Sequence, residues 1–223
     1  MKTSISYFAI ALLLLGSCKD SPKSQNTTET ANTATTDSVP FPKKLTHFKT
    51  PDIAPLFTGG GKDSWDQKIR ERGYILKEEG TYHMWYTGFG LAGKALALGY
   101  ATSPDGIVWT PHPDNPIFNE SWTEDMMVIK VNGTYHMFAE GENDVAHRLT
   151  STDRINWTDH GSLDIRKADG TPLNEGPYGT PTAWKENDTW YLFYERNDLG
   201  IWLATSKDLN VWTNVQDEPV LAM

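Results

Sequence analysis

The sequence contains only one cysteine among its 223 residues, so no disulfide framework can hold the fold together. It also lacks an excess of basic residues: 20 Lys and Arg stand against 29 Asp and Glu, giving a formal net charge of −9. A nucleic-acid surface needs clustered cations to displace counterions from phosphates, so we predict no nucleic-acid partner. Zinc-ligand spacings, phosphate-binding glycine loops and nucleophile elbows are absent from the sequence as well, which excludes the enzymes built on those motifs.

Apolar runs long enough to cross a membrane are also missing. The run at residues 7–15 is too short to span a bilayer, but it suits a secretory signal. It leads into the letters LGSC, ending at Cys18, which resemble the lipobox of bacterial lipoproteins. We therefore expect residues 1–18 to be a lipoprotein signal peptide and Cys18 to carry the lipid. The alternative is an ordinary signal peptide with an incidental cysteine.

The segment that follows, residues 19–40, is rich in Ser, Thr and Asn and has almost no large apolar side chains. Such a composition cannot form a core, so we expect a flexible tether. The remaining residues, 41–223, are expected to form the folded domain. A lipidated Cys18 would anchor the protein to the lipid bilayer of the bacterial cell envelope, in the periplasm or at the cell surface.

The folded part of the sequence is repetitive. Three related segments begin at Lys77 (KEEGTYHMWYTG), Lys130 (KVNGTYHMFAEG) and Lys185 (KENDTWYLFYER). Each combines a turn rich in Gly, Asn or Asp with alternating aromatic and apolar residues, which predicts a β-hairpin. A further strand and turn follow each hairpin, with Asp four residues ahead of a Trp-Thr pair: Asp105/Trp109, Asp153/Trp157 and Asp208/Trp212.

Four strands in about fifty residues is the period of a β-propeller blade. We therefore predict an all-β fold, a β-propeller of four-stranded antiparallel blades with about three blades present; the family resemblance described below implies a total of five. Three blades cannot close a ring, so we interpret the sequence as the front part of a longer propeller, truncated at its C-terminus. The repeated tryptophans are expected to pack between blades, and His83 and His136 to be packed or surface residues rather than metal ligands.

Acidic residues recur where these blades should share one rim. The start of each inner strand and the end of the next strand meet there, because the two strands are antiparallel. Aligning the hairpins on their lysines places Glu124 and Asp125 level with Glu71 and Arg72 in the first blade and with Gly179 and Thr180 in the third. The strand ends at this rim are Thr87, Glu140 and Glu195.

At these residues the sequence resembles the five-bladed propeller glycoside hydrolases, chiefly family 43, with families 32, 117 and 130 as relatives in fold. The stretch from Asp125 to Lys130 is similar to the start of a family 43 inner strand without its Pro, and Glu124-Asp125 looks like the first half of a family 130 Glu-Asp-Pro-Arg sequence. Glu175, in a Glu-Gly-Pro sequence, is similar to the family's general acid.

The resemblance implies a glycosidase that cleaves a plant or algal polysaccharide or oligosaccharide with one protonated and one ionised carboxyl group. It suggests Asp66 or Glu71 as the base, Asp125 as the carboxylate that orients the sugar and tunes the acid, and Glu175 as the acid, with Glu140 in reserve. Residues expected to contact the carbohydrate are Trp65, Arg70, Arg72, Trp122, Glu124, Tyr178, Glu195 and Arg196.

Two other functions stay open. A surface lipoprotein that binds glycans without cleaving them would fit Arg72, which stands where the family has an Asp. A phosphorylase of the family 130 type would need a cationic phosphate pocket next to Asp125. Each of the acids could instead be a solvated or paired rim charge. We predict no cofactor and no metal site, although a channel Ca²⁺ held by oxygens and waters would leave no spacing signature.

Overall fold

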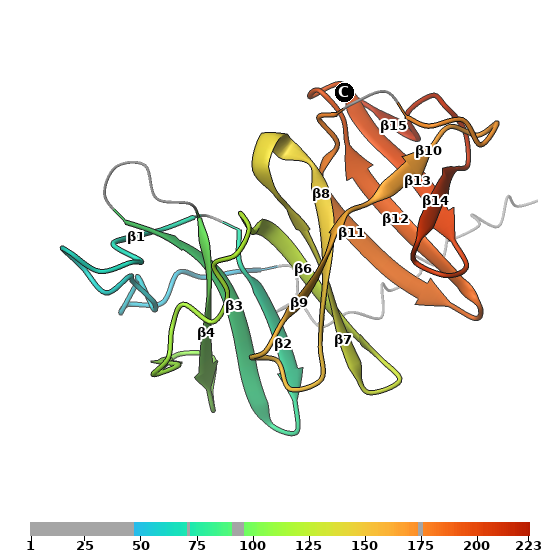
Figure 1. Cartoon of the computed structure of the whole chain (residues 1–223). Coiled ribbons are helices and arrows are strands. Elements are labelled where there is room, and N and C mark those ends of the chain that lie inside the picture. The colour runs from blue at the N-terminus through green and yellow to red at the C-terminus, as the bar shows by residue number, and fades with distance from the viewer. Residues whose placement is uncertain (1–46, 71, 91–95, 174–175) are drawn as a thin grey trace, which may run out of the picture. The chain divides into compact units, whose positions relative to one another are not determined.

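The computed structural model describes residues 47–70, 72–90, 96–173 and 176–223 (Figure 1). The predicted signal peptide, the tether and Cys18 lie outside these residues, as do Glu71 and Glu175. Residues Thr50–Met223 form one compact unit. In the described part of the chain no helix is long and apolar enough to cross a membrane.

The first sheet contains the first repeat. Its strands are β1 (Lys68–Ile69), β2 (Tyr74–Glu78), β3 (Thr81–Phe89), β4 (Ala97–Ser103) and β5 (Thr110–Pro111), all antiparallel. β1 and β2 pair with opposite ends of β3, so together they make one interrupted inner strand. The hairpin turn between β2 and β3 uses Glu79 and Gly80, both with positive φ, which matches the twist of the strands.

The second sheet repeats this plan with β6 (Glu124–Val131), β7 (Thr134–Glu140), β8 (Ala146–Ser151) and β9 (Thr158–Ser162) in sequential antiparallel order. A 3₁₀ turn, η2 (Glu142–Asp144), joins β7 to β8. The β6–β7 hairpin again turns through two residues with positive φ, Asn132 and Gly133. This sheet is the four-stranded blade that the sequence predicts.

The third sheet has the same core of strands and two additions. β11 (Gly179–Glu186), β12 (Thr189–Glu195), β13 (Gly200–Ser206) and β14 (Val211–Asn214) follow one another antiparallel. β10 (Asp164–Arg166) pairs in parallel with β14 at the outer edge, and β15 (Leu221–Ala222) pairs with β13. The sequence did not predict β10, because three residues give too short a pattern. The all-β prediction is confirmed.

The repeated turns explain why Asp and Trp recur. In each, the Asp carboxylate accepts hydrogen bonds from backbone N–H groups two and three residues later, as Asp153 does from Ile155 and Asn156. The Trp then packs on the preceding sheet: Trp157 lies edge-on to Trp85 at 6.1 Å, and the fully buried Trp212 lies edge-on to Phe138 at 5.8 Å. The prediction that these tryptophans pack between blades is confirmed for Trp157 and Trp212, whereas Trp109 packs beside Met84, Tyr86 and Ala101 of its own sheet.

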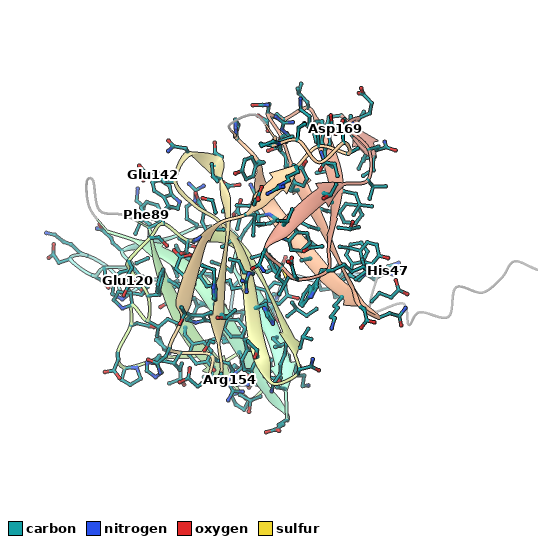
Figure 2. The ribbon with its side chains drawn as sticks, turned by 45° about the vertical axis from the view of Figure 1, so that its right-hand side comes forward. His47, Phe89, Glu120, Glu142, Arg154 and Asp169 are labelled. Carbon is teal, nitrogen blue, oxygen red and sulfur yellow. The ribbon has the colours of Figure 1, made fainter. Side chains whose placement is uncertain are left out.

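A polar cluster joins the first two sheets at the end that carries the hairpins, where Figure 2 shows Arg154. Glu78 on β2 accepts from Lys130 Nζ on β6 at 2.8 Å, from the Tyr135 hydroxyl on β7 at 2.5 Å and from Arg154 Nη1 at 3.4 Å. Burial opposes the carboxylate, but the contacts with Lys130, Tyr135 and Arg154 outweigh it and lower the pKa of Glu78.

Replacing Glu78 with Gln is expected to lower the free energy of unfolding by about 1 kcal/mol at neutral pH, a modest loss because the group is partly solvated. A carboxyl whose pKa is lowered in the folded state stabilises the protein fully above its unfolded pKa of about 4.3, and loses that contribution as pH falls through the folded pKa. Urea unfolding at pH 7 and pH 3 should therefore show the difference between wild type and variant shrinking in acid. An equal difference at both pH values would contradict this role.

Candidate active site

Each inner strand is irregular near the end opposite the hairpins. The pairing of β6 with β7 shifts between Glu124 and Met127, and Asp125 has a φ of 47°. The pairing of β11 with β12 shifts between Gly179 and Thr182, and Thr180 has a φ of 45°. Asp125 and Thr180 therefore occupy equivalent β-bulges, which re-aim side chains at the edge of a sheet. In the first sheet the break between β1 and β2 falls at this place, next to Arg72.

Glu124 and Asp125 are both buried, with relative exposures of 3% and 7%. Each forms an ion pair with an arginine from the first sheet: Arg70 Nε lies 2.7 Å from Glu124 Oε2, and Arg72 Nη1 lies 2.9 Å from Asp125 Oδ2. The indole N–H of Trp122 also donates to Glu124 Oε1 at 2.7 Å. The arginines compensate the burial of the two charges, and the cation next to Asp125 favours its ionised form.

Glu140 ends β7 and pairs directly with Glu124 across the two strands. Its Oε2 accepts hydrogen bonds from the backbone N–H of Thr180 at 2.7 Å and from the Thr180 hydroxyl at 3.2 Å. Burial raises the pKa of Glu140, and the negative charges of Asp125 and Asp144 raise it further, while the bonds from Thr180 act in the opposite direction. The proton therefore stays on Glu140 to a higher pH than on an ordinary Glu.

Asp125 and Glu140 are thus two buried carboxyl groups in contrasting surroundings. Asp125 lies against a guanidinium group, whereas Glu140 is near the negative charges of Asp125 and Asp144. Such a pair can place a proton on one group and a negative charge on the other at the same pH. This is the division of roles that glycosidic chemistry requires.

Glycine at position 179 leaves the space that Glu140 occupies. A Cβ added at Gly179 would lie 2.0 Å from Glu140 Oε2 and 2.7 Å from its carboxyl carbon. Sequence alignment marked Gly179 only as the counterpart of Glu124. Its role as a cradle for the carboxyl group is visible only in the fold.

Gly179→Ala is expected to push the Glu140 carboxyl group away from Thr180. If Glu140 takes part in catalysis, kcat should fall by at least about tenfold, since small displacements of catalytic groups are costly. The side chain of Glu140 can rotate, so the melting temperature should change little. Steady-state kinetics and thermal unfolding on the same sample test this. Unchanged kcat in a folded variant would show that the position of Glu140 does not matter.

Other predicted site residues lie in different surroundings. Asp66 is buried in the loop before β1, where it accepts hydrogen bonds from the backbone of Gly60 at 3.0 Å, from the Ser64 hydroxyl and from the Tyr86 hydroxyl at 3.2 Å. These contacts fix the loop. Trp65 packs on the ring of Tyr86 at 5.8 Å, beside the same loop.

The third sheet supplies three more of the predicted residues. Glu195 caps its own turn by accepting from the backbone N–H of Asp198. Arg196 lies over the ring of Trp202 at 5.7 Å. Tyr178 donates from its hydroxyl to the Leu163 carbonyl at 3.4 Å and packs against the third-sheet core. The structure thus brings together Arg70, Arg72, Trp122, Glu124, Asp125 and Glu140. Tyr178 also lies beside this group, because its backbone bonds to Asp144 and Ala146 at 2.9 Å. Glu195 pairs with Gly179 across β11 and β12.

One feature of this region could not be predicted from the sequence. His147, at the start of β8, is buried and lies 3.5 Å from Asp159 on β9, measured from Nδ1 to Oδ1. The two residues are twelve apart and follow no recognised motif, so only the β8–β9 pairing brings them together. They line a cleft beside Trp122.

Comparison with known proteins agrees with the fold and leaves the family unassigned. No family model matches the chain. A 1,2-beta-oligomannan phosphorylase from Thermoanaerobacter sp. (strain X514) is 25% identical over 177 residues, which cover 71% of this chain and 56% of that protein. The chain therefore spans about half the length of this curated relative.

Several solved structures are similar over most of the described part. A protein assigned as a glycoside hydrolase from Parabacteroides distasonis has a TM-score of 0.62 at 18% identity, covering 79% of this chain and 61% of that one. A family 117 glycoside hydrolase from the marine bacterium Zobellia galactanivorans has a TM-score of 0.54 at 17% identity, covering 74% and 61%. A GH43_1 enzyme from Xanthomonas citri, solved with xylose, has a TM-score of 0.51 at 15% identity, covering 65% and 53%. The chain shares their fold. The expected total of five blades stays a prediction.

Proposed function

We propose that the protein is a glycan-active enzyme that breaks glycosidic bonds, with Glu140 as the proton donor. The observation that carries this proposal is the pairing of a buried Glu140, whose pKa is raised, with an Asp125 held by Arg72. The glycosidase and phosphorylase names of the similar proteins support it. The full activity rests on the whole protein, of which this chain matches only part of the relatives' length.

In this proposal the Glu140 proton passes to the glycosidic oxygen as the bond from that oxygen to C1 breaks. The negative charge of Asp125 raises the pKa of Glu140 and so favours its protonated form, and the carboxylate of Asp125 orients the sugar. Hydrolysis also needs a carboxylate that removes a proton from the attacking water. Because Asp66 is already bound to Gly60, Ser64 and Tyr86, we favour Glu71 over Asp66 for that step.

Phosphorolysis is the second candidate, and one observation favours it. Phosphate is already an anion, so its attack on C1 needs no general base, but it does need cations to bind it. Arg70 and Arg72 pair with Glu124 and Asp125, but their side chains stay 37% and 55% exposed and can also donate to a phosphate. They lie where a base from the first sheet is expected in family 43 enzymes. The curated relative, which is named a phosphorylase, supports the same interpretation.

The test is product analysis with and without inorganic phosphate. The substrates are β-1,2-mannotriose, xylotriose, and arabinan, agar and carrageenan oligosaccharides. Free sugar released without phosphate supports hydrolysis, and sugar 1-phosphate formed only with phosphate supports phosphorolysis. Binding without turnover on every substrate would favour the non-catalytic glycan-binding lipoprotein and reject the enzymatic proposal.

We also propose that the protein is lipid-anchored in the bacterial cell envelope. The LGSC sequence ending at Cys18 supports this location, because the chain's only cysteine stands at the position a lipobox requires. Labelling cells with an alkynyl fatty acid tests the proposal. Label on the wild type and its loss in Cys18→Ser are expected, and an unlabelled wild type would reject it.

A further inference from the structure

A cleft of about 280 Å³ lies beside the candidate active site. It is bordered by the loop before β6, which carries Glu120 and Trp122, by the β7–β8 connection, which carries Glu142, and by the paired strands β8 and β9. Figure 2 labels Glu120 and Glu142, which mark the two loops. The cleft adjoins the acids, because Trp122 donates to Glu124 and the lining residue Gly141 directly follows Glu140.

One wall of the cleft contains a buried histidine that is fixed in place. Asp159 accepts from the Ser121 hydroxyl at 2.8 Å and from the backbone N–H of Gly161 at 2.8 Å, and it also contacts His147 Nδ1. These bonds hold the carboxylate, which in turn places the ring hydrogen of His147 on Nδ1. Burial lowers the pKa of His147 despite the charge of Asp159, so the ring is neutral at neutral pH.

The other ring nitrogen of His147 is then a hydrogen-bond acceptor. His147 is 5% exposed, and its Nε2 has no hydrogen-bond partner among the residues that the structure describes. A buried acceptor without a partner is unfavourable, so a ligand hydroxyl that reached it from the cleft, displacing the side chains that cover it, would be stabilised.

The rest of the lining limits the class of ligand. Glu120, Glu142 and Asp159 provide acceptors for hydroxyl groups and repel anions, and Trp122 provides aromatic surface. In the described part of the chain no three His, Cys, Asp or Glu side chains are arranged to hold a metal ion. These features suit a neutral sugar better than a uronate, a phosphate or a metal.

We propose that this cleft binds the neutral sugar unit next to the one at the catalytic carboxyl groups, with His147 Nε2 accepting a hydrogen bond from a sugar hydroxyl. This assignment rests on the proposed function, because the catalytic roles of Asp125 and Glu140 fix where the neighbouring sugar lies. It makes His147 a binding residue for longer substrates, held in position by Asp159.

His147→Leu tests the proposal. It should lower kcat/KM at least tenfold for the turned-over trisaccharide, β-1,2-mannotriose or xylotriose, and leave kcat/KM unchanged for the corresponding glycosyl fluoride, which carries no second ring. The matched control is His160→Leu, because His160 lies on the same strand as Asp159 but outside the cleft. It should change neither value. An equal loss on both substrates, or no loss on either, would overturn the proposal.

A second measurement on the wild-type chain does not depend on turnover or on the folding of a variant. In protein labelled with ¹⁵N-histidine, β-1,2-mannotriose or xylotriose should shift the His147 Nε2 resonance and leave that of His160 in place. No change at His147 with either trisaccharide would overturn the cleft assignment. A shift of the His147 resonance without any turnover would support sugar binding in the cleft and reject the enzymatic proposal. The two proposals can therefore fail separately.

Discussion

Glu140→Gln is expected to lower kcat about 10²–10⁴-fold on an oligosaccharide, which is the usual contribution of a general acid. An amide cannot donate a proton to the leaving oxygen, although Gln can still accept the hydrogen bonds that Thr180 gives to Glu140. Because the amide imitates the protonated carboxyl group, the variant should be at least as stable as the wild type. Steady-state kinetics on the substrate identified by the product analysis measure the loss.

The loss should depend on the leaving group. The 2,4-dinitrophenolate group of a dinitrophenyl glycoside leaves without being protonated. If Glu140 is the acid, the variant should therefore retain most of its activity on that glycoside. The control is Glu186→Gln, an exposed carboxyl group at the opposite end of β11. An equally large loss on both substrates would mean that Glu140 has a structural role, and no loss on either would mean that the acid lies elsewhere.

The sequence was sufficient to predict the fold because the fold is repetitive. Asp105, Asp153 and Asp208 each organise the same turn through the same backbone hydrogen bonds, so a local pattern fixes the same local structure three times. The hairpin turns follow equally local rules. The additions to the third sheet, β10 and β15, depend on contacts with β14 and β13 instead, and such short strands leave no pattern.

The candidate site could be predicted only in part. Strand alignment placed Glu124 and Glu140 at the same rim, and in the structure the two residues pair directly across β6 and β7. It could not foresee that Arg70 and Arg72 reach across from the first sheet, because side-chain contacts between sheets do not follow strand spacing. The bulge at Asp125 left a weak signal, since Asp tolerates positive φ better than most residues.

Charge balance explains the adjacent acids at 124 and 125. Two buried carboxylates would be unfavourable without partners, and each arginine of the first sheet neutralises one of them. The bulge separates the directions of the two side chains, so that Glu124 contacts Trp122 while Asp125 acts on Glu140. The same two ion pairs also link the first sheet to the second.

Asp125→Asn is expected to reduce kcat at least about 10²-fold, because the sugar-orienting carboxylate and its charge are both lost. The variant should also shift the pH profile. The negative charge of Asp125 raises the pKa of Glu140, so its removal lowers that pKa, and Glu140 then loses its proton at a lower pH. The alkaline limb of kcat should therefore move to lower pH, which a pH–rate profile measures.

Stability measurements separate this effect from unfolding. Asn tolerates the φ of 47° at position 125, and Arg72 is 55% exposed and can be solvated, so the free energy of unfolding should change by no more than about 1 kcal/mol. Asp125→Ala removes the same charge but places an ordinary side chain in the left-handed region, which should cost about 1–2 kcal/mol more. If both variants lose activity alike and only the Ala variant loses stability, the charge is what matters. A folded Asn variant with full activity and an unmoved alkaline limb would show that Asp125 takes no part in the chemistry.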